Sequence, residues 1–122
     1  MHLGPVTPIL RSFDAGLARA FYVDYLGFEV LFEHRFEPQL PLYMGIRRSD
    51  CELHLSEHHG DATPGAAVRI RVDDVDALLA ELRGKSYPNA RPSAHDQPWG
   101  TRDMTLTDPF GNRLTFTSAI SL

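Results

Sequence analysis

The chain has 122 residues, of which 43% are hydrophobic and 23% are charged. This length and composition predict one soluble globular domain that can bury its own core. A net charge of −4 argues against a nucleic-acid partner, and no apolar run approaches the ~18 residues that a membrane helix needs. The single cysteine, Cys51, excludes an internal disulfide, so we expect a reducing, cytoplasmic location.

The chain begins with a strand pattern followed by a helix pattern. Residues 5–11 have strand character, but Pro5 and Pro8 cannot donate to a ladder, which favours an edge, a bend or a segment that reaches elsewhere. Asp14 is a good N-cap, and Gly27 is suited to end the helix that follows it. One face of this helix should be buried, because apolar and aromatic residues recur on it at helical spacing. These residues are Ala18, Phe21, Tyr22 and Tyr25.

Three further strands are expected in the first half of the chain. Apolar and polar residues alternate over residues 28–33, 40–46 and 51–57, which is the period of half-buried strands. In the last of these strands the odd-numbered residues point to one side, and Glu52 and His54 point to the other. Residues 58–65 are polar and rich in turn formers, so they are expected to form a linker.

The same order restarts after the linker. We expect a strand over residues 67–72 and a helix that is capped by Asp73 or Asp74 and ends at Gly84. A weakly marked strand near residues 89–92 should follow. The last element is a hairpin, with strands over residues 101–107 and 113–117.

This duplicated order predicts the fold. We expect an α+β protein in which residues 1–122 form a single domain, built from two βαβββ modules of about residues 1–58 and 65–122. Side by side, the modules would form a curved mixed sheet with a concave cleft. Polar side chains from several strands should line its concave side. They are Thr7, Arg11, Glu52, His54, Ser56, Arg69, Arg71, Thr105, Thr115 and Thr117.

Four segments of the chain resemble a known superfamily. They read VTPILRSFD, AFYVDYLGFEV, RIRVDDVDALLAEL and QPWGTRDMTLTDPFGN. LGF and DPxGN are typical of the whole vicinal-oxygen-chelate superfamily of glyoxalases, bleomycin-resistance proteins and dioxygenases. Pro8 and the PWG bend around Trp99 resemble its bleomycin-resistance branch more closely. The resemblance implies a paired βαβββ fold and a homodimer with ligand clefts between the subunits, in which the first strand can be exchanged.

The resemblance also bears on metal binding. Enzymes of this superfamily hold a divalent metal on the concave sheet, and a catalytic site needs about three protein groups. The resemblance places the ligand positions at Thr7, Ala67 and Thr115, with Glu52 or His54 as the fourth. Threonine is a poor ligand and alanine is none. We therefore predict no metal, no other cofactor and no catalytic residue.

Aromatic residues are the main candidates for a ligand site. Phe32, Phe36 and Trp99 would suit a planar ligand through stacking. The alternative for Phe32 and Trp99 is that they fill the core. Arg69 and Arg71 would suit an anionic or carbonyl-bearing ligand if they face the cleft, or they pair with Glu52.

Acidic side chains at the cleft would favour a cationic ligand. Glu33, Glu37 and Asp103 would attract a cation if they lie at the cleft. The complete set of predicted ligand-binding residues is Phe32, Phe36, Glu52, His54, Arg69, Trp99, Asp103 and Thr105.

These features predict a non-catalytic resistance protein. It would sequester a bleomycin-type antibiotic, or another planar drug or metabolite, in two intersubunit clefts of a homodimer. The alternatives are a metal-dependent enzyme of the glyoxalase or dioxygenase type and a binding module for a small metabolite.

Overall fold

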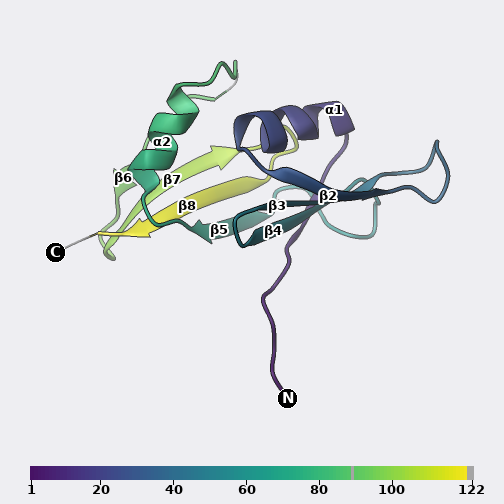
Figure 1. The fold of residues 1–122 in the computed structure, drawn as a ribbon, viewed down its shortest axis with the longest axis horizontal. Coiled ribbons are helices and arrows are strands. Elements are labelled where there is room, and N and C mark those ends of the chain that lie inside the picture. The colour runs from purple at the N-terminus through teal and green to yellow at the C-terminus, as the bar shows by residue number, and fades with distance from the viewer. Residues whose placement is uncertain (89, 121–122) are drawn as a thin grey trace.

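The computed structural model describes residues 1–88 and 90–120. Their strands form two four-stranded sheets, with the orders β1-β4-β3-β2 and β5-β8-β7-β6. Each sheet is mixed, because β1 runs parallel to β4 and β5 runs parallel to β8, while the other neighbours are antiparallel. In Figure 1 the helices lie above the strands. The predicted α+β fold of paired βαβββ modules is confirmed, with the strands divided between two open sheets.

The first sheet and its helical cover come from the first half of the chain. Asp14 caps the first helix as expected, since its carboxylate accepts from the backbone N–H of Leu17 at 2.9 Å. The helix then widens into a π-helical segment, and Gly27 leaves it with a φ of 76°. The four side chains predicted for its inner face are all buried. The elements are β1 (Ile9–Arg11), α1 (Ala15–Ala18), η1 (Arg19–Tyr25), β2 (Glu29–His34), β3 (Tyr43–Arg48) and β4 (Cys51–Ser56).

The second half repeats this order. Asp74 is the cap of its helix, accepting from the N–H groups of Asp76 and Ala77. The strand expected near residues 89–92 is wrong for residues 90–92, and Asn89 lies outside the described residues. The short strand lies at β6 instead, where it pairs with the start of β7. The elements are β5 (Ala67–Arg71), α2 (Val75–Arg83), β6 (His95–Asp96), β7 (Thr101–Thr107) and β8 (Arg113–Ala119).

The chain before β1 forms an extended arm. The strand expected over residues 5–11 covers only Ile9–Arg11, and the preceding residues run away from the body of the molecule (Figure 1). Leu3 and Val6 on this arm are 81% and 86% exposed. Pro8 joins the arm to the sheet, because its carbonyl accepts from the N–H of His54 at 2.9 Å.

The β7–β8 turn connects the two halves of the chain. Asp108 is buried there and accepts a hydrogen bond of 2.5 Å from the hydroxyl of Tyr22 on η1. Asn112 donates from its side-chain nitrogen to the carbonyl of Arg11 in β1 at 2.8 Å. The DPFGN turn therefore positions the first half of the chain as well as its own hairpin. None of the helices in the described part of the chain is long and apolar enough to cross a membrane.

Candidate functional site

A β-bulge in β2 determines which side chains reach the outer face of the first sheet, the face away from the helices. The register with β3 shifts between Val30 and Phe32. As a result Phe32 lies opposite Gly45, and an added Cβ at Gly45 would be only 2.2 Å from the phenyl ring. The ring therefore lies directly on the backbone of β3. Phe32 is 41% exposed, so its interpretation as a core residue is wrong.

Two neighbours of Phe32 complete an aromatic and polar cluster on this face. The ring of Tyr43 is nearly parallel to it, with centroids 6.1 Å apart, and the ring of His54 meets it edge-on at 5.3 Å. The hydroxyl of Tyr43 lies 2.7 Å from Nδ1 of His54, and Nε2 of His54 lies 2.7 Å from Glu52. Both ring nitrogens of His54 thus have partners. We call these four residues the first-sheet cluster: Phe32, Tyr43, Glu52 and His54.

The electrostatics of this cluster keep Tyr43 protonated. Burial raises the pKa of the Tyr43 phenol, and the nearby carboxylates of Asp61 and Glu52 raise it further. The neutral hydroxyl can donate to Nδ1 of His54, which leaves the Nε2–H to donate to Glu52. The cluster therefore presents aromatic faces beside a hydrogen-bonded carboxylate.

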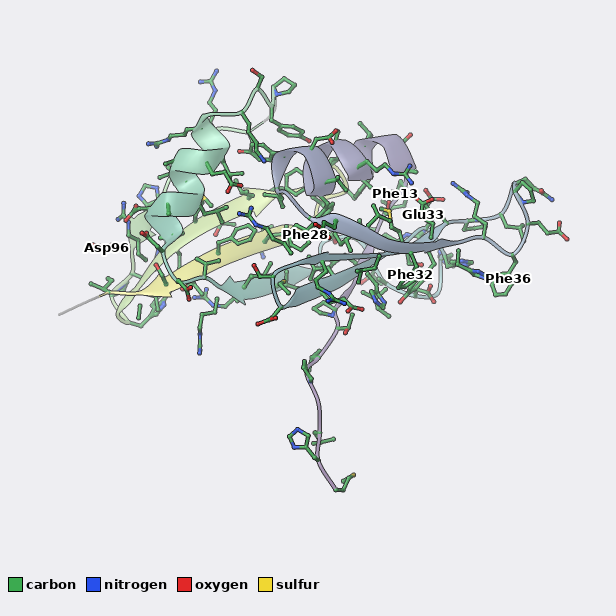
Figure 2. The ribbon with its side chains drawn as sticks, in the orientation of Figure 1. Phe13, Phe28, Phe32, Glu33, Phe36 and Asp96 are labelled. Carbon is green, nitrogen blue, oxygen red and sulfur yellow. The ribbon has the colours of Figure 1, made fainter. Side chains whose placement is uncertain are left out.

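Phe36 and Glu33 lie outside this cluster. Figure 2 shows Phe36 closer than Phe32 to the tip of the β2–β3 connection. Its ring meets that of His34 edge-on at 4.6 Å. Glu33 lies on the helix side of β2 and pairs with Arg19 of η1, so the expectation that it serves the cleft is wrong.

Four of the predicted residues meet on the second sheet. Arg69, Trp99, Asp103 and Thr105 line one hollow of about 350 Å³ on the face away from α2. Trp99 lies in the turn before β7, next to Gly100, whose φ of 97° favours glycine. Trp99 is 65% exposed, so it does not fill the core. The remaining lining residues are Ser93, His95, Gln97 and Thr115.

Asp103 anchors this hollow and is only 7% exposed. Burial by itself would raise the pKa of Asp103, but hydrogen bonds from two threonine hydroxyls and from Arg69, with the charge of Arg69, hold it below its ordinary value. The hydroxyls belong to Thr117, at 2.6 Å, and Thr101, at 2.9 Å. The Arg69 guanidinium lies 3.2 Å from the carboxylate. The suggested pairing of Arg69 with Glu52 is therefore wrong.

A separate cavity of about 740 Å³ lies between the two halves of the chain. Its lining includes residues from β4, β5 and α2, and Glu52 and Arg69 reach it from the two sheets. Val6 and Pro8 of the N-terminal arm also line it. The arm thus leaves the molecule at the edge of an open space beside both sheets.

The positions that hold a metal in enzymes of the superfamily do not fit one here. Ala67 has no donor atom, and the hydroxyls of Thr105 and Thr115 are hydrogen-bonded to each other at 2.8 Å. His54 has partners on both ring nitrogens. Within residues 1–88 and 90–120, no group of three or more His, Cys, Asp and Glu side chains is arranged to hold a metal ion.

Sequence reasoning missed Tyr43 and Gly45. Both lie on the outer face of β3, alternating with the buried Met44 and Ile46. The alternation in the sequence predicts the face on which each residue lies. It does not predict that a phenyl ring from β2 would occupy the space above Gly45. That contact depends on the bulge.

The chain is similar to known proteins both in sequence and in fold. The profile of a family described as "Glyoxalase superfamily protein" matches residues 2–121. The bleomycin-binding protein from bleomycin-producing Streptomyces verticillus, complexed with copper(II)-bleomycin, has a TM-score of 0.73 and 33% identity over 98% of both chains. No curated protein sequence matches the chain.

Two further structures have the same fold. A bleomycin-binding protein complexed with bleomycin has a TM-score of 0.70 and 25% identity, covering 95% of this chain and 98% of the other. A bleomycin resistance determinant encoded on the transposon Tn5 has a TM-score of 0.71 and 25% identity, covering 96% of this chain and 98% of the other. The chain therefore belongs to the glyoxalase/bleomycin resistance/dioxygenase superfamily.

Proposed function

We propose that this protein binds a bleomycin-type antibiotic without chemical turnover. It would protect the cell by sequestering the drug. The observation that carries the proposal is the likeness to the bleomycin-binding protein of Streptomyces verticillus, at 33% identity over 98% of both chains. A sequestering protein needs a complementary surface and no reactive group. We further propose that it acts in the cytoplasm, in keeping with its single cysteine.

The two candidate surfaces offer what a planar drug requires. The first-sheet cluster presents Phe32 beside Tyr43, and the second sheet presents the exposed indole of Trp99. Each stacking contact with a planar ring adds roughly 1 kcal/mol beyond the area it buries. Because the two surfaces belong to different sheets, a homodimer that places the first sheet of one subunit opposite the second sheet of its partner would unite them in one cleft.

The N-terminal arm supports a dimer of this kind. Leu3 and Val6 are exposed apolar side chains on a segment that extends from the body, a liability unless a partner covers them. Val6 and Pro8 line the cavity between the two halves, where an arm from a second subunit could lie. We propose that the arms are exchanged between subunits.

Calorimetric titration with bleomycin tests the proposal. We expect one drug molecule to bind per subunit, with and without chelator, and mass spectrometry to recover the drug unchanged. Absence of binding heat from metal-free and copper-loaded bleomycin would refute the proposal. Modification of the drug, or activity on it that disappears with chelator, would instead support a metal-dependent enzyme.

A further inference from the structure

Arg69 is held in position by a buried partner. Its two terminal nitrogens lie 3.2 and 3.4 Å from the carboxylate oxygens of Asp103, and one also lies 3.3 Å from the hydroxyl of Thr117. These contacts use three of the five N–H donors of a guanidinium. The side chain remains about half exposed and lines the hollow on the second sheet. A fixed, charged donor is therefore presented to whatever enters the hollow.

The charges of the hollow are not equally available. Asp103 is almost fully buried, and each of its oxygens already accepts at least one hydrogen bond. His95, the other titratable lining residue, is hydrogen-bonded through Nε2 to Ser93 at 3.0 Å. An entering cation would meet the guanidinium of Arg69 and a carboxylate that is already engaged. An entering anion would meet a guanidinium with donors to spare.

The rest of the hollow suits a flat ligand. Its volume of about 350 Å³ lies within the range of small-molecule sites, roughly 300–1,000 Å³. The indole of Trp99 supplies a stacking surface on the same hollow as Arg69. Arginine gives short, charge-assisted hydrogen bonds to planar oxyanions such as carboxylates. Indole and guanidinium together match an aromatic ring that bears an anionic oxygen.

We infer that this hollow is a subsite for a planar aromatic anion, in which Arg69 binds the anionic oxygen and Trp99 stacks on the ring. The inference goes beyond the proposed function, because it concerns the ligand chemistry that this hollow recognises, whichever drug the complete cleft takes. Asp103 is a positioning residue, because it holds the guanidinium and leaves the ligand to Arg69.

Three probes with one ring system test the inference: 2-naphthoate, 2-naphthamide and 2-naphthylmethylammonium. The chain has one tryptophan, so a single indole N–H resonance of the ¹⁵N-labelled protein reports on the hollow during each titration. We expect naphthoate to bind at least about tenfold more tightly than the ammonium compound, because only the carboxylate can accept charge-assisted hydrogen bonds from Arg69. The amide should lie between them. Equal or tighter binding of the ammonium compound overturns the inference, whatever the variants do.

Two arginine variants locate the effect. Arg69→Gln should remove the preference for naphthoate, and Arg69→Lys should retain part of it because the charge remains without the planar fork. Arg71→Gln is the matched control, with the same change of charge two residues along β5 but outside the lining of the hollow, and it should keep the preference. Loss of the preference in Arg71→Gln to the same extent would show a general charge effect and overturn the inference.

The two proposals fail in different ways. If bleomycin binds but the protein shows no preference for naphthoate, the subsite is wrong and the proposed function stands. If the preference depends on Arg69 but bleomycin gives no heat, the subsite stands and the proposed function is wrong.

Discussion

Trp99 is the single residue whose exposure matters most for the proposed function. Its indole is 65% exposed on a turn held by the hydrogen bond from the N–H of Gly100 to the carbonyl of Gln97. Trp99→Ala should weaken drug binding by roughly 1–3 kcal/mol, the scale of a lost aromatic anchor. It should change the free energy of unfolding by only about 0.5 kcal/mol, because little of the side chain is buried. Calorimetry and thermal denaturation measure the two effects. A large loss of stability with unchanged affinity would show that the indole is structural.

At the scale of the element, the bulge in β2 positions Phe32 over Gly45. Gly45→Ala would place a Cβ 2.2 Å from the ring, so the ring must move away and lose its contact with Tyr43. We expect the variant to lose roughly 1–3 kcal/mol of stability, as in other overpacked sites, and to bind the drug less tightly. Thermal melts and calorimetry test both expectations.

Gly60→Ala is the matched control for this change. A Cβ added at Gly60 would meet no atom within 4 Å, so the variant should behave like the wild-type protein. If Gly45→Ala is as stable as Gly60→Ala and binds equally well, the ring of Phe32 is not held against β3 in solution.

At the scale of the whole molecule, the N-terminal arm determines the proposed assembly. Removing residues 1–7 leaves the pairing of β1 with β4 intact, so each subunit should still fold. We expect the shortened protein to be monomeric and to lose affinity for the drug, because each proposed cleft needs two subunits. Light scattering and circular dichroism measure mass and folding.

A second variant separates the length of the arm from its apolar contacts. Replacing Leu3 and Val6 with serine keeps the length but removes the two exposed apolar side chains, and it should weaken the dimer in the same direction. A full-length protein that is monomeric at micromolar concentration, or a truncated protein that remains dimeric, contradicts the exchange of arms.

Features that depend on short-range patterns could be predicted from the order of the residues. The helical spacing of Phe21, Tyr22 and Tyr25 identified the buried face of the first helical segment, and Asp14 identified its start. The strict alternation in β4 placed His54 on the outer face. Each of these features is set within a few residues by backbone geometry and by the separation of apolar from polar side chains.

The assembly of the candidate site depends on contacts between strands that are far apart in the sequence. The partner of Arg69 proved to be Asp103, two strands away across β8, and the position of β6 was set by its pairing with β7. The direction of Phe32 depended on a bulge that no local pattern marks. Contacts between distant strands depend on register and on which backbone leaves room for a ring, as at Gly45, and these are properties of the paired strands together.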